Sequence, residues 1–121
     1  MEKQTCYTWV ENAVEMARDD FAGALVLDEG KFALLRSTCM MIDEMMDEFE
    51  CESYDVKVEY ETQNLVISFS CLDMVMENGR NHKFFRVAKR ATSLDIVPEN
   101  EDCMTVSFTF GGLWIPENAD E

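Results

Sequence analysis

Four carboxylates lie close together on one predicted helix and are the first candidates for chemistry. They are Asp43, Glu44, Asp47 and Glu48. Carboxylates one helical turn apart can share a divalent cation, and Glu44 could serve as a general base. However, no nucleophile or orienting partner can be named for Glu44, and a row of surface acids is more commonly a solvated helix face. We therefore predict no metal site and no catalytic residue.

A cluster of basic residues is the sharpest anomaly in a chain whose formal net charge is −15. Its members fall on the outer face of a predicted third helix and are Arg80, Lys83, Arg86, Lys89 and Arg90. No acidic residue stands between Glu77 and Asp95. Three interpretations stay open: a solvated face, pairing with the acidic helix of the same chain, or a docking surface for an acidic partner or a phosphate. The five residues are candidates for partner binding.

Methionines offer a second candidate surface, since thioethers repack readily against different partners. Four of them lie on the predicted second helix, where we expect them to fill the core: Met40, Met41, Met45 and Met46. Met74 and Met76 instead alternate around Val75 in a stretch without clear periodicity. There they could form an exposed apolar patch, so both join the candidates for partner binding.

The cysteines and the single histidine, His82, argue against a zinc site. The cysteines are Cys6, Cys39, Cys51, Cys71 and Cys103. Their number is odd and none are spaced as Cys-x-x-Cys, whereas zinc sites need clusters of Cys and His. We expect small buried thiols in a reducing compartment, and hence a cytoplasmic protein.

Length and composition indicate one globular domain. The chain has 121 residues, of which 47% are hydrophobic, so residues 1–121 can form one core, with frayed tails at about 1–6 and 116–121. No apolar run has the length of a signal peptide or a membrane span, so we expect no membrane partner. The acidic charge excludes nucleic acid, because phosphate contacts need a basic surface.

Hydrophobic periodicity predicts three helices. They cover residues 9–22, 31–50 and 80–91. Thr8 and Glu11 have the spacing of a capping box for the first helix, and Asp28 is a suitable cap for the second. Like charges at i,i+4 and the helix dipole disfavour the acids of the second helix, so packing or a cation must offset them. Residues 24–27 fit either a last helical turn or a short strand.

Short apolar and alternating stretches predict four strands in two antiparallel hairpins. They cover residues 54–61, 65–71, 94–97 and 104–110. Val56, Ile67, Val106 and Phe108 should share one dry side. The predicted fold class is α+β, a two-layer α/β sandwich whose four-stranded, mainly antiparallel sheet is covered on one face by the helices. Residues 113–115 could cover the sheet or one of its edges.

Two stretches of this chain have the order of elements found in a known family. IDEMMDEFECESYDVKVEYETQNLVISFSC forms a helix followed by a hairpin, and RVAKRATSLDIVPENEDCMTVSFTF forms a helix, strand, turn and strand. Together they resemble the core of the histidine-kinase-type ATPases, the GHKL superfamily, particularly its small anti-sigma-factor members. The resemblance is one of pattern and covers about two-thirds of the chain.

The resemblance implies a nucleotide site with a degenerate set of residues. Glu44 would match the acid that positions or activates water in the family, and Glu48 stands where the family has a magnesium-binding Asn. Asp73 would match the Asp that contacts adenine, although the glycines that follow it in the family are absent from CLDMVME. The implied function is a nucleotide-binding, ATPase-like regulator that takes ATP and Mg.

Because the residues form no complete active site, our leading hypothesis is a non-catalytic cytoplasmic domain for protein interaction or regulation, without a cofactor. It would contact a partner protein through the basic helix or the Met-rich stretch. The ATPase-like regulator is the alternative. A homodimer formed through an edge strand or the segment around Trp114 is a third hypothesis.

Overall fold

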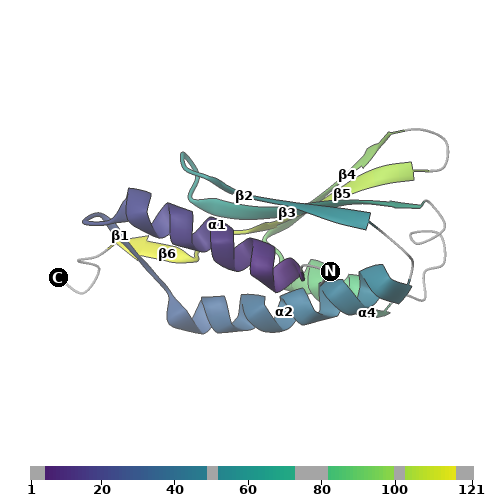
Figure 1. The fold of residues 1–121 in the computed structure, drawn as a ribbon, viewed down its shortest axis with the longest axis horizontal. Coiled ribbons are helices and arrows are strands. Elements are labelled where there is room, and N and C mark those ends of the chain that lie inside the picture. The colour runs from purple at the N-terminus through teal and green to yellow at the C-terminus, as the bar shows by residue number, and fades with distance from the viewer. Residues whose placement is uncertain (1–4, 49–51, 73–81, 100–102, 117–121) are drawn as a thin grey trace.

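The order of elements matches the predicted helices and hairpins, with two short strands added. The computed structural model describes residues 5–48, 52–72, 82–99 and 103–116. The elements are α1 (Cys6–Phe21), β1 (Leu25–Leu27), α2 (Glu29–Glu48), β2 (Glu52–Glu59), β3 (Asn64–Leu72), α4 (His82–Arg90), β4 (Ser93–Pro98), β5 (Cys103–Phe110) and β6 (Trp114–Pro116) (Figure 1). One sheet has the order β2-β3-β5-β4, and β1 pairs with β6 in a second. The α+β class is confirmed.

The two hairpins form one sheet because β3 pairs antiparallel with β5. Val56 lies opposite Ile67, and Ile67 lies opposite Phe108. Leu94 completes this row on β4. Directly opposed residues share a face, and Ile67, Val106 and Phe108 are fully buried. The predicted dry side of the sheet is therefore confirmed.

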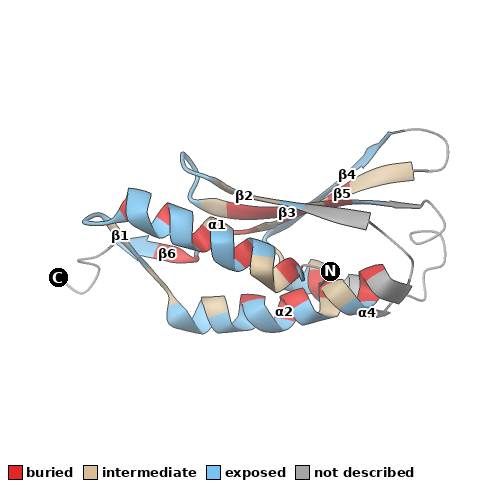
Figure 2. Ribbon diagram, in the orientation of Figure 1, coloured by how far each residue is buried: buried red, intermediate tan, exposed pale blue. Residues whose placement is uncertain are grey.

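The helices α1, α2 and α4 lie on the same side of the four-stranded sheet (Figure 1). On α1 and α2 the buried residues recur at helical spacing and face the core (Figure 2). On α1 these residues are Cys6, Val10, Val14, Ala17 and Phe21. On α2 they include Leu35, Cys39, Ile42, Met45 and Met46. Each stripe is the one-sided pattern expected of a helix that covers a sheet.

One methionine prediction for α2 is wrong. Met45 and Met46 are buried, as expected, and Met41 packs partly buried against the core. Met40, however, is 63% exposed, because at 3.6 residues per turn it falls on the side of α2 opposite the buried stripe.

The first helix begins earlier than the sequence predicted. Thr5, not Thr8, is the N-cap, and its hydroxyl accepts a hydrogen bond from the Thr8 N–H at 3.2 Å. A hydroxyl three residues upstream therefore serves the cap, and the added turn carries Cys6 from the expected frayed tail into the core. The predicted cap of α2 is correct, since the Lys31 N–H donates to Asp28 Oδ1 at 3.1 Å.

The first hairpin turns two residues earlier than predicted. Gln63 has a left-handed φ of 59° and its N–H donates to the Glu59 carbonyl at 2.7 Å. This contact closes the loop after Glu59, so Tyr60 lies beyond the end of β2. Its ring, expected on the dry face, is 47% exposed.

The segment around Trp114 pairs within the chain. Val26 of β1 lies opposite Ile115 of β6, so residues 24–27 contain a strand and not a helical turn. The Trp114 ring is only 5% exposed and meets Phe21 edge-on, with 5.3 Å between the ring centroids. This aromatic pair closes one end of the core, and Trp114 itself is not available as an exposed dimer contact.

An acid of α2 caps the start of α1. The N–H of Cys6, the first residue of α1, donates to Asp43 Oδ1 at 2.9 Å. A helix start carries unpaired N–H groups and a partial positive charge. The start of α1 thus stabilises the negative charge of Asp43, which the dipole of α2 disfavours.

Asp43→Asn is expected to lower the free energy of unfolding by about 1–2 kcal/mol, because it weakens a charge-assisted hydrogen bond and a favourable helix-dipole interaction. Urea denaturation followed by circular dichroism measures the change. Asp95→Asn, at an exposed acid on β4, is the matched control and should change the value by less than about 0.5 kcal/mol. Equal losses in the two variants would contradict the capping role.

Two thiols meet where α1 packs on α2. Cys6 and Cys39 are fully buried free cysteines. The hydrogen bond between their side chains raises the pKa of the Cys6 thiol, and burial and the Asp43 carboxylate raise this pKa further. Cys6 is therefore a neutral, poorly nucleophilic core residue.

The raised pKa of Cys6 predicts a loss of stability at alkaline pH. The unfolded thiol ionises near its ordinary pKa of about 8.5 while the folded thiol stays neutral, so stability is level below that pH and falls above it, by up to about 1.4 kcal/mol per pH unit. Cys6→Ala should flatten this slope between about pH 8 and 10 in urea denaturation. Cys103→Ala should retain it, and a slope unchanged in Cys6→Ala would refute the assignment.

Candidate functional site

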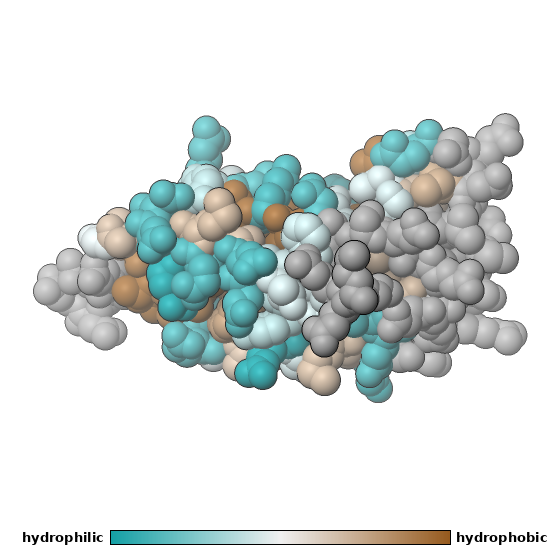
Figure 3. Space-filling view, in the orientation of Figure 1, coloured by the Kyte–Doolittle hydropathy of each residue, from teal (hydrophilic) through white to brown (hydrophobic). Residues whose placement is uncertain are grey.

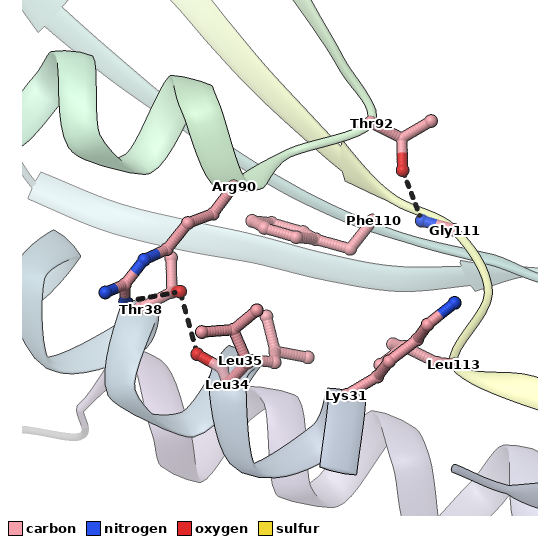
Figure 4. Close-up of a pocket in the computed structure, with 9 residues that line it drawn as sticks. All are labelled: Lys31, Leu34, Leu35, Thr38, Arg90, Thr92, Phe110, Gly111 and Leu113. Atoms are coloured by element: carbon pink, nitrogen blue, oxygen red, sulfur yellow. Dashed lines mark hydrogen bonds between the residues drawn. The ribbon is translucent and has the colours of Figure 1, made fainter.

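A pocket of about 240 Å³ opens where α2, α4 and the end of β5 meet (Figure 4). Its walls are apolar and come from Leu34, Leu35, Phe110 and Leu113. Its polar groups are the side chains of Lys31, Thr38, Arg90 and Thr92. Segments far apart in the sequence therefore combine apolar walls with two cations.

Arg90 is held at the pocket by neutral groups. Its guanidinium donates to Thr38 Oγ1 at 3.2 Å and to Ser37 Oγ at 3.3 Å. The Thr38 hydroxyl in turn donates to the Leu34 carbonyl at 2.8 Å, which orients its oxygen to accept from Arg90. Within the described segments no carboxylate forms an ion pair with Arg90. Its positive charge is thus positioned but not neutralised.

Lys31 brings a second cation to the same pocket. It lies in the first turn of α2, where the helix dipole disfavours a positive charge. Its ammonium group lies against Gly112, so closely that a Cβ there would collide with Nζ. Gly112 also has a φ of 75°, a conformation that favours glycine. No carboxylate among the described residues pairs with Lys31.

Thr92 ties the end of α4 to the end of β5 and fixes one side of the pocket. Its N–H donates to the Thr109 carbonyl at 2.7 Å, and its hydroxyl accepts from the Gly111 N–H at 2.9 Å. A Cβ at Gly111 would lie 2.9 Å from Asn64 Oδ1, so glycine permits this close approach. The position of Arg90, two residues before Thr92, depends on these bonds.

The charged groups of the lining suit an anion. It contains two cations and no carboxylate, in a chain with 25 acidic residues. A guanidinium, an ammonium group and apolar walls suit an anion that carries an apolar neighbour. Within the described part of the chain, no group of three or more His, Cys, Asp or Glu residues could hold a metal ion.

Of the predicted partner-binding residues whose side chains are described, Arg90 lines this pocket. Arg86 and Lys89 are exposed on α4, and neither pairs with a described carboxylate. For these three residues, pairing with the acidic helix is therefore not the explanation of the basic cluster. The other candidates cannot be placed: Lys83 has no described side chain, and Arg80, Met74 and Met76 lie outside the described residues.

Of the predicted nucleotide residues, Glu44 does not line the pocket. Glu44 is exposed on α2, and Glu48 is the last residue of that helix. Asp73 lies outside the described residues, so the nucleotide site stays a prediction. Sequence reasoning missed Lys31 and Thr92 as site residues. The sequence offered one signal: Lys31 lies in the first turn of α2, where the helix dipole disfavours a positive charge.

Comparisons of the chain with protein-family models, with curated proteins and with solved structures gave no match. The resemblance to the GHKL superfamily thus remains a prediction. Among the described helices, none is long and apolar enough to cross a membrane.

Thr92→Val tests the tie between α4 and β5. It removes the acceptor of the Gly111 N–H and is expected to lower the free energy of unfolding by about 1 kcal/mol. Thr109→Val, the same change on the adjacent strand, has no side-chain hydrogen bond to lose and should be near neutral. Thermal unfolding measures both, and faster amide exchange at Gly111 should accompany the loss in Thr92→Val alone.

Proposed function

We propose that this chain is a non-catalytic interaction domain, with a regulatory role, that takes up an acidic group of a partner protein in the pocket between α2, α4 and β5. One observation carries the proposal. Lys31 and Arg90 flank an apolar pocket that has no carboxylate in its lining, although the chain has a net charge of −15. Unneutralised cations gathered at one place favour a negatively charged group of another molecule.

The size and chemistry of the pocket favour a carboxylate beside an apolar side chain. Its volume of about 240 Å³ is below the roughly 300–1,000 Å³ of typical small-molecule sites. Arg90 keeps guanidinium donors beyond those given to Ser37 and Thr38, and a guanidinium can bind a carboxylate with two hydrogen bonds. Phe110 and Leu113 would accept the neighbouring apolar side chain. An acidic side chain or a chain terminus fits this description.

The exposed face of α4 would extend the contact beyond the pocket. Arg86, Lys89 and Arg90 recur at helical spacing, and all three are exposed. Val87, between them in sequence, is fully buried and fixes the helix to the core. Exposed cations of this kind mainly speed association and make it sensitive to salt. They would guide an acidic segment toward Arg90.

We also propose a reducing compartment such as the cytoplasm. Cys6 and Cys39 are adjacent free thiols joined by a hydrogen bond. Two thiols this close together stay reduced more readily in a compartment in which disulfides do not persist.

A fluorescein-labelled peptide that ends in Glu-Asp-Leu-Phe with a free carboxylate is the probe for this site. Arg90→Glu or Lys31→Glu is expected to weaken its binding about tenfold or more, because each variant places a carboxylate against the anion. Fluorescence anisotropy measures the dissociation constant. Arg18→Glu, at an exposed cation of α1 that pairs with Glu15 at 3.5 Å, should leave binding within about twofold.

Three results separate the possible outcomes. Equal losses in Arg18→Glu and Arg90→Glu would indicate general attraction and contradict a site. An absence of binding to the wild-type protein would also contradict the proposal. Magnesium-ATP, added as a competitor, tests the nucleotide alternative: displacement of the peptide that is lost in Glu44→Gln would favour the ATPase-like regulator.

A further inference from the structure

A second surface lies between α1 and the edge strand β2. Unlike the cationic pocket, it is bordered by elements in which acidic residues outnumber basic ones. Among the described strands, the order β2-β3-β5-β4 leaves one side of β2 without a neighbour. Along this edge a groove of about 350 Å³ is lined by apolar side chains of both elements, including Ala13, Met16, Val56 and Val58. Figure 3 shows apolar atoms in the band between α1 and β2.

The α1 wall of the groove is a second apolar stripe on that helix. Trp9, Ala13 and Met16 recur at i, i+4 and i+7, beside the buried stripe that contains Val10 and Val14. Trp9 is 40% exposed and Met16 is 67% exposed. Exposed apolar side chains that lie next to one another are typical of an interaction surface, whereas single exposed ones are common on any protein.

The β2 wall presents backbone as well as side chains. From Tyr54 to Glu59 the pairing with β3 is regular, after a bulge at the start of the strand. Alternate N–H and C=O groups of a strand with one neighbour point away from that neighbour. Val56 and Val58 are half-buried beside α1, while Lys57 is exposed. The edge therefore offers hydrogen-bonding groups next to an apolar floor.

One end of the groove is held rigid by Tyr60. Its ring meets Phe21 edge-on, with 5.4 Å between the centroids, and its hydroxyl hydrogen-bonds to Asp20. A ring fixed at both ends can serve as a preorganised wall, which lowers the entropic cost of binding.

The charge around the groove selects the partner. Helix α1 carries four carboxylates and one guanidinium, and that guanidinium, on Arg18, pairs with Glu15. The sequence of β2 has three acidic residues and one lysine, Lys57, which is the charged residue among those that line the groove. A segment flanked by basic residues is complementary to these acids, whereas a second copy of the chain that paired through β2 would bring the same acidic elements together.

We propose that an extended peptide segment, apolar at alternate residues and flanked by Lys or Arg, adds to β2 as a fifth strand and places its apolar side chains in the groove. Main-chain hydrogen bonds to the edge would supply affinity, and the pockets between α1 and β2 would select the side chains. This surface is independent of the cationic pocket and takes a partner of opposite charge.

The test uses a fluorescein-labelled peptide of sequence KKVTVTVKK and the full chain. Met16→Ser should weaken binding about tenfold, since it removes an apolar side chain that the peptide would cover. Met40→Ser is the matched control: Met40 is 63% exposed on α2, close to the 67% of Met16. It should leave the dissociation constant within about twofold. Binding should also slow amide exchange along β2.

Two further peptides test the chemistry of the proposal. EEVTVTVEE should bind at least tenfold more weakly, as expected for an acidic surface. A version of KKVTVTVKK that is N-methylated at alternate residues should also lose binding, because it cannot pair with the strand edge. Unchanged affinity of the methylated peptide, or equal losses in Met16→Ser and Met40→Ser, would overturn the proposal. So would a dimer in sedimentation that Met16→Ser dissociates, since a second copy would then fill the groove.

Discussion

The pairing of β3 with β5 is the interaction on which the rest of this fold depends. Each hairpin alone exposes one apolar face, and neither would be stable in isolation. When Ile67 comes opposite Phe108, the faces of the two hairpins become one continuous surface that three helices can cover. Because side chains alternate along a strand, a shift of one residue in this pairing would turn Ile67 or Phe108 toward water. The apolar pattern thus fixes the register.

The helices add a second constraint, which concerns charge. A chain with 25 acidic residues and 10 basic ones cannot pair each carboxylate with a cation. At Asp43 the solution is a backbone N–H at the start of α1. The start of α1 thus helps to stabilise one acid of α2. Among the described residues, Lys31, Arg86 and Arg90 form no ion pair with a carboxylate.

Sequence reasoning succeeded where a local pattern decides the structure. The alternation around Val56 and Ile67 and the helical stripe of α2 both predicted the observed core, because period and burial are linked directly. It was less accurate where two local signals compete. Thr5 and Thr8 are both suitable caps, and the choice between them depends on the burial of Cys6 against Cys39, a contact between distant segments.

The candidate site was predicted only in part, for a related reason. The basic cluster identified Arg90, since clustering is visible in the sequence. Lys31 and Thr92 belong to the pocket only because the end of β5 turns back past α2, and no local pattern encodes that approach. The pairing of β1 with β6 was not predicted, although a short strand at residues 24–27 was one of two alternatives. Three-residue strands such as Leu25–Leu27 are too short for periodicity to decide.

The two proposed interactions depend on the distribution of charge more than on its total. Helix α1 and strand β2, which border an apolar groove at one edge of the sheet, carry more acids than bases. Cations of α2 and α4 flank a pocket beneath the end of β5. At physiological ionic strength charges are screened beyond about 8 Å, so each surface is governed by its own side chains and not by the net charge of −15. An overall acidic chain can therefore present a local site for an acidic group, provided that no carboxylate forms an ion pair with the cations of that site. The neutral hydroxyls of Ser37 and Thr38, which hold Arg90, meet this condition where carboxylates would not.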